Sequence, residues 1–164
     1  MTAGKAFFPL FVDMSGRKAL VIGGGNIAER RIKVLAGFGA EITVIAPAVT
    51  GYIEQAASSQ TLRLIRRTYQ EGDITGLAPF LVIAATDERQ VNHAVMTEAR
   101  NMNIQVSVAD RSEECTFYFP AVAENETFIA GLVSKNGDHA GVRRMAEKIR
   151  ELFREGNQEL DAYE

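Results

Sequence analysis

The stretch Lys18-Ala-Leu-Val-Ile-Gly-Gly-Gly-Asn-Ile-Ala28 decides the fold of this chain. Its first part, which ends at Ile22, is a short apolar run, and such runs are typical of strands buried on both faces of a sheet. Glycines follow, and the pattern then changes to a helical period over residues 26–38. The apolar face of this predicted helix consists of Ala28, Ile32, Leu35 and Ala36. A buried strand, a glycine turn and an amphipathic helix together predict the start of a parallel βαβ unit.

The glycine turn has the spacing G-x-G-x-x-A, which is supplied by Gly23-Gly24-Gly25-Asn26-Ile27-Ala28. In this motif the first glycine makes the tight turn, Gly25 removes a Cβ that would block a pyrophosphate, and Ala28 lets the helix pack closely on the strand. The backbone N–H groups of Asn26 and Ile27 are then free to bind phosphates. In this context the motif predicts a dinucleotide site. The alternative is a glycine turn that only packs tightly.

The second predicted strand, Glu41–Ala46, bears on which dinucleotide is bound. An acidic residue at the end of this strand normally binds the ribose hydroxyls of NAD, whereas an arginine nearby accommodates the 2′-phosphate of NADP. Here the strand runs out in Ile45-Ala46-Pro47, and Glu41 lies at its start. The acidic residue and the arginine are both missing from this place. Because there is no arginine for a 2′-phosphate, the sequence favours NAD over NADP.

Strands and helices alternate along residues 1–112. The periodicity predicts an edge strand at 62–68, a central strand at 80–85, a helix at 87–102 and a further strand at 104–108. Either Asp87 or Thr86 is placed to cap this helix, whose buried face should consist of Val91, Ala94, Val95, Ala99 and Met102. Such alternation forces a parallel sheet with right-handed crossovers. We therefore expect an α/β fold with a Rossmann-type doubly wound parallel sheet over residues 1–112.

Residues 113–164 break the alternation. Two segments, Cys115–Pro120 and Thr127–Ser134, have the composition of strands and are joined by a polar turn, which predicts a hairpin. A helix follows, and its apolar stripe consists of Val142, Met145, Ala146, Ile149, Leu152 and Phe153. This part is too short to build a core of its own. We expect a short C-terminal α+β dimerisation extension through which two copies of the chain form a homodimer.

Composition excludes several classes of protein. The 18 Lys and Arg against 21 Asp and Glu give a net charge of −3, which argues against general affinity for nucleic acid. No apolar run approaches the roughly 20 residues that cross a bilayer, so we expect no membrane partner. The first residues lack the pattern of a secretory signal. The single cysteine, Cys115, forms no internal disulfide and fits a reducing, cytoplasmic location.

Several short motifs occur in one order and spacing: Phe8–Asp13, Gly23–Ala28, Ala84–Asp87, Val108–Asp110, Phe117–Pro120 and Ser134. In this arrangement the chain closely resembles the siroheme-synthase N-terminal module, from about Phe7 to Phe153. That module is a precorrin-2 dehydrogenase, and in some members also a sirohydrochlorin ferrochelatase. The resemblance implies that NAD⁺ takes a hydride from the tetrapyrrole precorrin-2, which gives sirohydrochlorin.

The resemblance also assigns residues to the dinucleotide and to catalysis. It implies contacts of the dinucleotide with the backbone of Asn26 and Ile27, with Pro47 and Ala48, and with Thr86, all at the carboxyl ends of parallel strands. Asp110 matches the catalytic aspartate of the family, which assists proton removal. On spacing alone, Asp110 reads as an Asx-turn or cap after a strand.

Further residues are assigned to the substrate. Ser134 matches a serine that lines the tetrapyrrole pocket, although a serine in this place is also a common helix cap. The segment Lys135–His139 departs from the small, glycine-rich stretch of the family. Precorrin-2 carries several carboxylates, which Arg143 and Arg144 are placed to bind, unless they form only a solvated basic face. The family dimerises through this region.

Two other functions compete with the dehydrogenase. The first is a non-catalytic redox sensor or regulatory module that binds NAD(H) and signals through the dimer, which the departure at Lys135–His139 suits. The second is a nucleotide-gated subunit of a transporter, because such modules share the glycine motif. The matches at Phe8–Asp13 and Phe117–Pro120 count against the transporter subunit.

Overall fold

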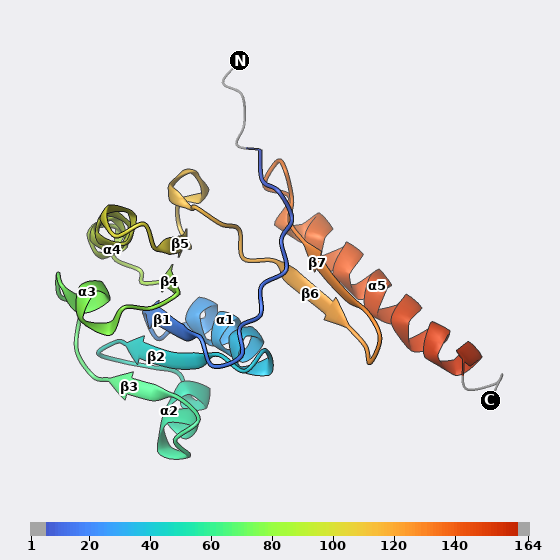
Figure 1. Cartoon of the computed structure of the whole chain (residues 1–164), viewed down its shortest axis with the longest axis horizontal. Coiled ribbons are helices and arrows are strands. Elements are labelled where there is room, and N and C mark those ends of the chain that lie inside the picture. The colour runs from blue at the N-terminus through green and yellow to red at the C-terminus, as the bar shows by residue number, and fades with distance from the viewer. Residues whose placement is uncertain (1–5, 161–164) are drawn as a thin grey trace. The chain divides into compact units, whose positions relative to one another are not determined.

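A five-stranded parallel sheet forms the centre of the first part of the chain in the computed structural model, which describes residues 6–160 (Figure 1). The strands are β1 (Lys18–Ile22), β2 (Glu41–Ile45), β3 (Arg63–Ile65), β4 (Leu81–Ala84) and β5 (Gln105–Val108), in the spatial order β3-β2-β1-β4-β5. The predicted edge position of β3 and the predicted internal position of β4 are confirmed. Because the strand order reverses direction at β1, a crevice is expected at the carboxyl ends of β1 and its two neighbours.

Four helices connect these strands: α1 (Asn26–Gly37), α2 (Gly51–Ser58), α3 (Asp73–Leu77) and α4 (Arg89–Asn101). Right-handed crossovers carry the chain from β1 toward β3 through α1 and α2, and in the opposite direction through α3 and α4. The two pairs of helices therefore cover opposite faces of the sheet (Figure 1). The short helices α2 and α3 are absent from the sequence-based prediction.

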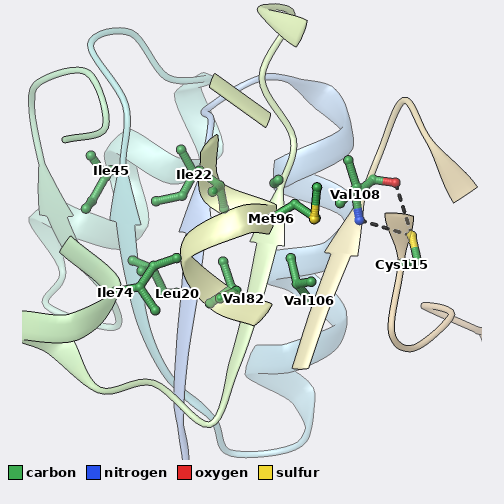
Figure 2. Close-up of a cluster of buried hydrophobic side chains, with 12 residues drawn as sticks. Leu20, Ile22, Ile45, Ile74, Val82, Met96, Val106, Val108 and Cys115 are labelled. Carbon is green, nitrogen blue, oxygen red and sulfur yellow. Dashed lines mark hydrogen bonds between the residues drawn. The ribbon is translucent and has the colours of Figure 1, made fainter. Parts of the chain in front are cut away.

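Strands β1 and β4 are buried on both faces, as their continuous apolar sequences predict. Leu20, Val82 and Val106 are paired across the sheet and lie in one cluster with residues of α3 and α4, including Ile74 and Met96 (Figure 2). The alternate set, in which Val21 pairs with Val44 and Ile83, is also fully buried. Since successive side chains of a strand point to opposite faces, this set packs toward α1 and α2.

The segment after β5 differs from the prediction. A 3-10 turn at Ser112–Glu114 (η1) leads into residues 115–120, which form no strand, and the next strand begins only after Pro120. The reason is that Cys115 and Thr116 bond back to β5: the Cys115 Sγ accepts the N–H of Val108 at 3.1 Å (Figure 2), and the Thr116 N–H donates to the Val106 carbonyl at 2.8 Å. Cys115 is buried, but its predicted place in a strand is wrong.

The chain divides into two compact units between Tyr118 and Phe119. This boundary lies six residues beyond the division expected between residues 112 and 113, because the bonds of Cys115 and Thr116 to β5 hold the intervening segment in the first unit.

The second unit is a hairpin with one long helix. Strands β6 (Ala121–Glu124) and β7 (Ile129–Leu132) pair antiparallel, and α5 (His139–Leu160) follows. The hairpin and its second strand are as predicted, but its first strand begins only after the predicted segment Cys115–Pro120. The turn between the strands is held by the Asn125 side-chain oxygen, which accepts the backbone N–H groups of Thr127 and Phe128. Arg150 of α5 donates to the Val122 carbonyl at 2.7 Å, and Phe153 stacks with Phe128.

No helix among residues 6–160 is both long enough and apolar enough to cross a membrane.

Candidate functional site

A pocket of about 510 Å³ lies at the carboxyl ends of β1, β2 and β4. It is lined by the glycine loop that follows β1, by the turn after β2, by Thr68 and Tyr69, and by the segment between β4 and α4. The structure brings all the predicted dinucleotide-binding residues to this one pocket: Gly23, Gly24, Gly25, Asn26, Ile27, Pro47, Ala48 and Thr86. A second pocket of about 360 Å³, near Lys18, Glu41 and Gln60, contains none of them.

Packing within the protein explains the first two glycines. Gly23 has a φ of +115°, and a Cβ there would lie 2.6 Å from the carbonyl carbon of Ala85, and closer still to its oxygen. A Cβ on Gly24 would lie 2.7 Å from the Cγ1 of Val49. Both glycines are therefore needed for the fold itself, because they let the loop pass between the turns that follow β2 and β4.

Packing does not explain Gly25. Its φ of −83° is open to any residue, and a Cβ at this position would have no protein atom within 4 Å among residues 6–160. The space beside the Gly25 backbone is therefore open, which is what the motif requires for a pyrophosphate.

Gly25 is also the N-cap of α1. Within the described residues no side chain caps this helix, so the first-turn N–H groups remain available for an anion. The helix dipole adds to the attraction, because the N-terminus of a helix carries a partial positive charge.

Tyr69 forms part of the pocket wall and is tied to α4. Its hydroxyl donates a hydrogen bond to the carboxylate of Glu98, which also accepts the Thr75 N–H at 3.0 Å and the Gly72 N–H at 3.1 Å. Burial, together with the Glu98 carboxylate, raises the pKa of Tyr69 above its ordinary value. Burial acts to raise the pKa of Glu98, but these hydrogen bonds outweigh it and lower that pKa. The loop that carries the pocket wall is thus fixed by a carboxylate with several donors.

A second polar cluster lies where β4 and β5 end. The side chain of Asn92, on α4, is 0% exposed and bonds both to Thr86, which lines the pocket, and to Asp110. Arg89 lies beside this pair: one guanidinium nitrogen is 3.7 Å from the second carboxylate oxygen of Asp110, and another bonds to Glu114. The structure thereby links the predicted catalytic aspartate to a predicted dinucleotide-binding residue.

Sequence reasoning missed Asn92, Arg89 and Glu114. A signal for Asn92 exists, since the buried face of α4 consists of Asn92, Val95, Met96 and Ala99, at helical spacing. The prediction placed Ala94 on this face, but Ala94 is exposed. The predicted cap is also wrong: Glu88 is the N-cap of α4, and the Thr86 hydroxyl instead accepts the Glu88 N–H at 3.2 Å.

The residues predicted to bind substrate all belong to the second unit. The Ser134 hydroxyl accepts the N–H of Asp138 at 2.8 Å, and the Asp138 carboxylate accepts the N–H of Gly141 at 2.7 Å at the start of α5. Asp138 therefore caps the helix, and Ser134 shapes the loop before it. Arg143 and Arg144 follow on α5 and are exposed.

Comparison with known proteins gives consistent matches over most of the chain. Residues 10–121 match the model of a family described as putative NAD(P)-binding. The chain is 47% identical over 146 residues to a probable multifunctional siroheme biosynthesis protein of Ruminiclostridium josui, and 34% identical over 149 residues to the siroheme synthase of Psychrobacter arcticus. These matches cover 88% and 91% of this chain but only 28% and 27% of those proteins.

A solved structure, that of SirC, a precorrin-2 dehydrogenase, is similar with a TM-score of 0.75 and 29% identity. The match covers 88% of this chain and 70% of that one. The similarity therefore extends from the sheet and its glycine loop through most of the chain.

Proposed function

This chain belongs to the family of putative NAD(P)-binding domains represented by the siroheme-synthase N-terminal module, and from that premise we propose that it is an NAD-dependent dehydrogenase that oxidises precorrin-2 to sirohydrochlorin. The solved relative similar to it is a precorrin-2 dehydrogenase. The chain spans less than a third of the curated relatives it matches, so the proposal concerns the reaction of this module alone.

The observation that carries the proposal is the open space at Gly25 in front of an uncapped helix. These features fit a pyrophosphate, which the amides of Asn26 and Ile27 would hold, while Pro47, Ala48 and Thr86 line the rest of the pocket. NAD⁺ bound there supplies the acceptor for a hydride. NAD is favoured over NADP because the residues that follow β2, Pro47 and Ala48, offer no cation for a 2′-phosphate.

Asp110 is proposed to accept the proton that leaves with the hydride. The oxidation is balanced, because precorrin-2 and NAD⁺ give sirohydrochlorin, NADH and one proton. The Asp110 side chain is 36% exposed, so it is accessible to a substrate, and Asn92 holds one of its oxygens. The guanidinium of Arg89 lies 3.7 Å from the other oxygen. A carboxylate that is held in place and still partly exposed suits a general base.

Substrate binding and assembly are proposed for the second unit. Exposed Arg143 and Arg144 carry the charge needed to bind the carboxylates of a tetrapyrrole, and the Ser134 loop lies before the same helix. Large apolar side chains are exposed on this unit: Phe128, Ile129, Val133, Met145 and Leu152. Such a surface supports a homodimer. The lone, reduced Cys115 agrees with a cytoplasmic enzyme.

The test is turnover with enzymatically prepared precorrin-2. We expect NADH and sirohydrochlorin, followed by their separate absorbance bands, to appear together and in equal amounts when NAD⁺ is added. Omission of NAD⁺ is the control. Tight binding of NADH without any sirohydrochlorin would overturn the dehydrogenase and support the redox sensor instead.

A further inference from the structure

We propose that Asn92 is the positioning residue of this site: its side-chain amide fixes the proton acceptor Asp110 relative to the dinucleotide pocket. The inference rests on the proposed function, and it adds a residue that neither the glycine motif nor the strand ends identify. Asn92 lies on α4, between Thr86 at the end of β4 and Asp110 beyond the end of β5.

The amide of Asn92 makes every hydrogen bond that it can make. Its oxygen accepts the backbone N–H of Thr86 at 3.1 Å and the Thr86 hydroxyl at 2.8 Å. Its nitrogen donates to the Thr86 carbonyl at 3.0 Å and to Oδ1 of Asp110 at 2.9 Å. Two donors and two acceptor positions are the full capacity of a carboxamide.

The bonds to Thr86 fix which way the amide points. A backbone N–H can only donate, so the oxygen of Asn92 must face the amide of Thr86, and the nitrogen must then face Asp110. An aspartate at this position would keep the acceptors for the Thr86 N–H and hydroxyl, but it would lose the N–H donors to the Thr86 carbonyl and to Asp110. The amide is therefore specifically suited to hold one oxygen of the Asp110 carboxylate, while Arg89 faces the other oxygen at 3.7 Å.

The burial of the Asn92 side chain argues against a purely structural role for it. Asn92 and Ser107 are the only polar residues among those described that are buried, and the neighbours of Asn92 on the same face of α4 are Val95, Met96 and Ala99. An apolar side chain would continue that face without the cost of burying an amide. A buried polar group with all its bonds made instead gives a fixed geometry.

The decisive variant is Asn92→Asp, which keeps the volume of the side chain. We expect kcat for precorrin-2 oxidation to fall by about 10- to 100-fold, because misplacement of a reacting group by about 1 Å has effects of this size. The Kd for NADH should change by less than about three-fold, because the acceptors for Thr86 remain. Gln90→Glu is the matched control: it makes the same chemical change at an exposed position of the same helix and should keep the wild-type kcat.

The outcomes separate this inference from the proposed function. If the wild-type protein shows no turnover, the proposed function fails. If it does turn over and Asn92→Asp has the kcat of Gln90→Glu, Asn92 has no positioning role. Loss of kcat and of NADH affinity by the same factor also overturns the inference, since it indicates general damage to the site.

A measurement on folded protein remains available if Asn92→Asp does not fold. In NMR spectra, the side-chain NH₂ resonances of Asn92 should shift and exchange faster with solvent when Asp110 is replaced by alanine, because the donor loses its acceptor. Unchanged resonances would show that the Asn92–Asp110 bond does not exist in solution.

Discussion

Replacing Gly25 by alanine tests the phosphate site with little effect on the fold. The added Cβ would meet no atom of the described residues within 4 Å, and the φ of −83° suits alanine, so the free energy of unfolding should change by no more than about 1 kcal/mol. The same Cβ would occupy the space through which a pyrophosphate reaches the amides of Asn26 and Ile27.

The loss of affinity follows from these two amides. A hydrogen bond to a charged group contributes about 1.5–3 kcal/mol, so loss of both raises the binding free energy by about 3–6 kcal/mol. This corresponds to a Kd for NAD⁺ or NADH that is about 10²- to 10⁴-fold higher. Titration calorimetry measures the Kd, and thermal unfolding without ligand measures the stability.

Gly23→Ala provides the contrast. Its Cβ would overlap the backbone of Ala85, and its φ of +115° is unfavourable for alanine, so we expect a loss of stability of about 2–4 kcal/mol. We expect that Gly25→Ala loses binding and keeps its melting temperature, whereas Gly23→Ala melts at a lower temperature than the wild type. Wild-type affinity for NADH in a folded Gly25→Ala protein would refute the reasoning.

Three further predictions concern catalysis, acid stability and assembly. Asp110→Ala should lower kcat by about 10²-fold or more while NADH affinity, measured by fluorescence titration, stays within about three-fold; unchanged turnover would remove Asp110 from the mechanism. The guanidinium of Arg67, which forms two bonds of 2.7 and 2.8 Å to Asp73, lowers the pKa of that carboxyl, so its contribution to stability is present above the ordinary pKa of 3.8 and is lost as the pH falls through the lower folded pKa. Asp73→Asn should therefore be less stable at neutral pH and lose less stability on acidification in urea-unfolding series, and parallel pH profiles for the two proteins would contradict this. Leu152→Glu, at a position 63% exposed on α5, should convert the expected dimer to a monomer in sedimentation velocity, and a wild-type protein that is already monomeric at micromolar concentration would disprove the dimer.

The parts of the fold that were predictable are those with strong periodicity. The buried strands β1, β2 and β4 and the long helices α1, α4 and α5 each have an apolar pattern of full length, which local sequence expresses directly. Helix α3 has only five residues and buries only Ile74, so it offers no repeating pattern to detect. The bounds of the short elements therefore had to come from tertiary structure.

The error at Cys115–Pro120 has a different cause. Its aromatic and β-branched residues have the composition of a strand, but their hydrogen bonds go to β5 through the Cys115 thiol and the Thr116 backbone and hydroxyl. Composition alone does not reveal such bonds, because they depend on where the chain lies after the turn at Ser112–Glu114.

In the candidate site, too, the local features could be predicted from the sequence and the long-range contacts could not. The glycine loop is recognisable because its spacing reflects local backbone geometry. The structure adds that Gly24 is needed for packing, whereas no atom in the described part of the chain requires a glycine at Gly25. The link from Thr86 to Asp110 was not recognisable, because Asn92 is eighteen residues from Asp110 and only the crossover from β4 to β5 brings them together.

The most direct test of the account is a titration of isotope-labelled protein with NAD⁺, followed by backbone amide NMR. We expect the largest shifts at Gly25, Asn26 and Ile27, with smaller shifts at Ala48 and Thr86 around the same pocket. Shifts confined to the other pocket, near Lys18, Glu41 and Gln60, or no shifts at saturating NAD⁺, would contradict the dinucleotide site and the oxidoreductase proposal with it.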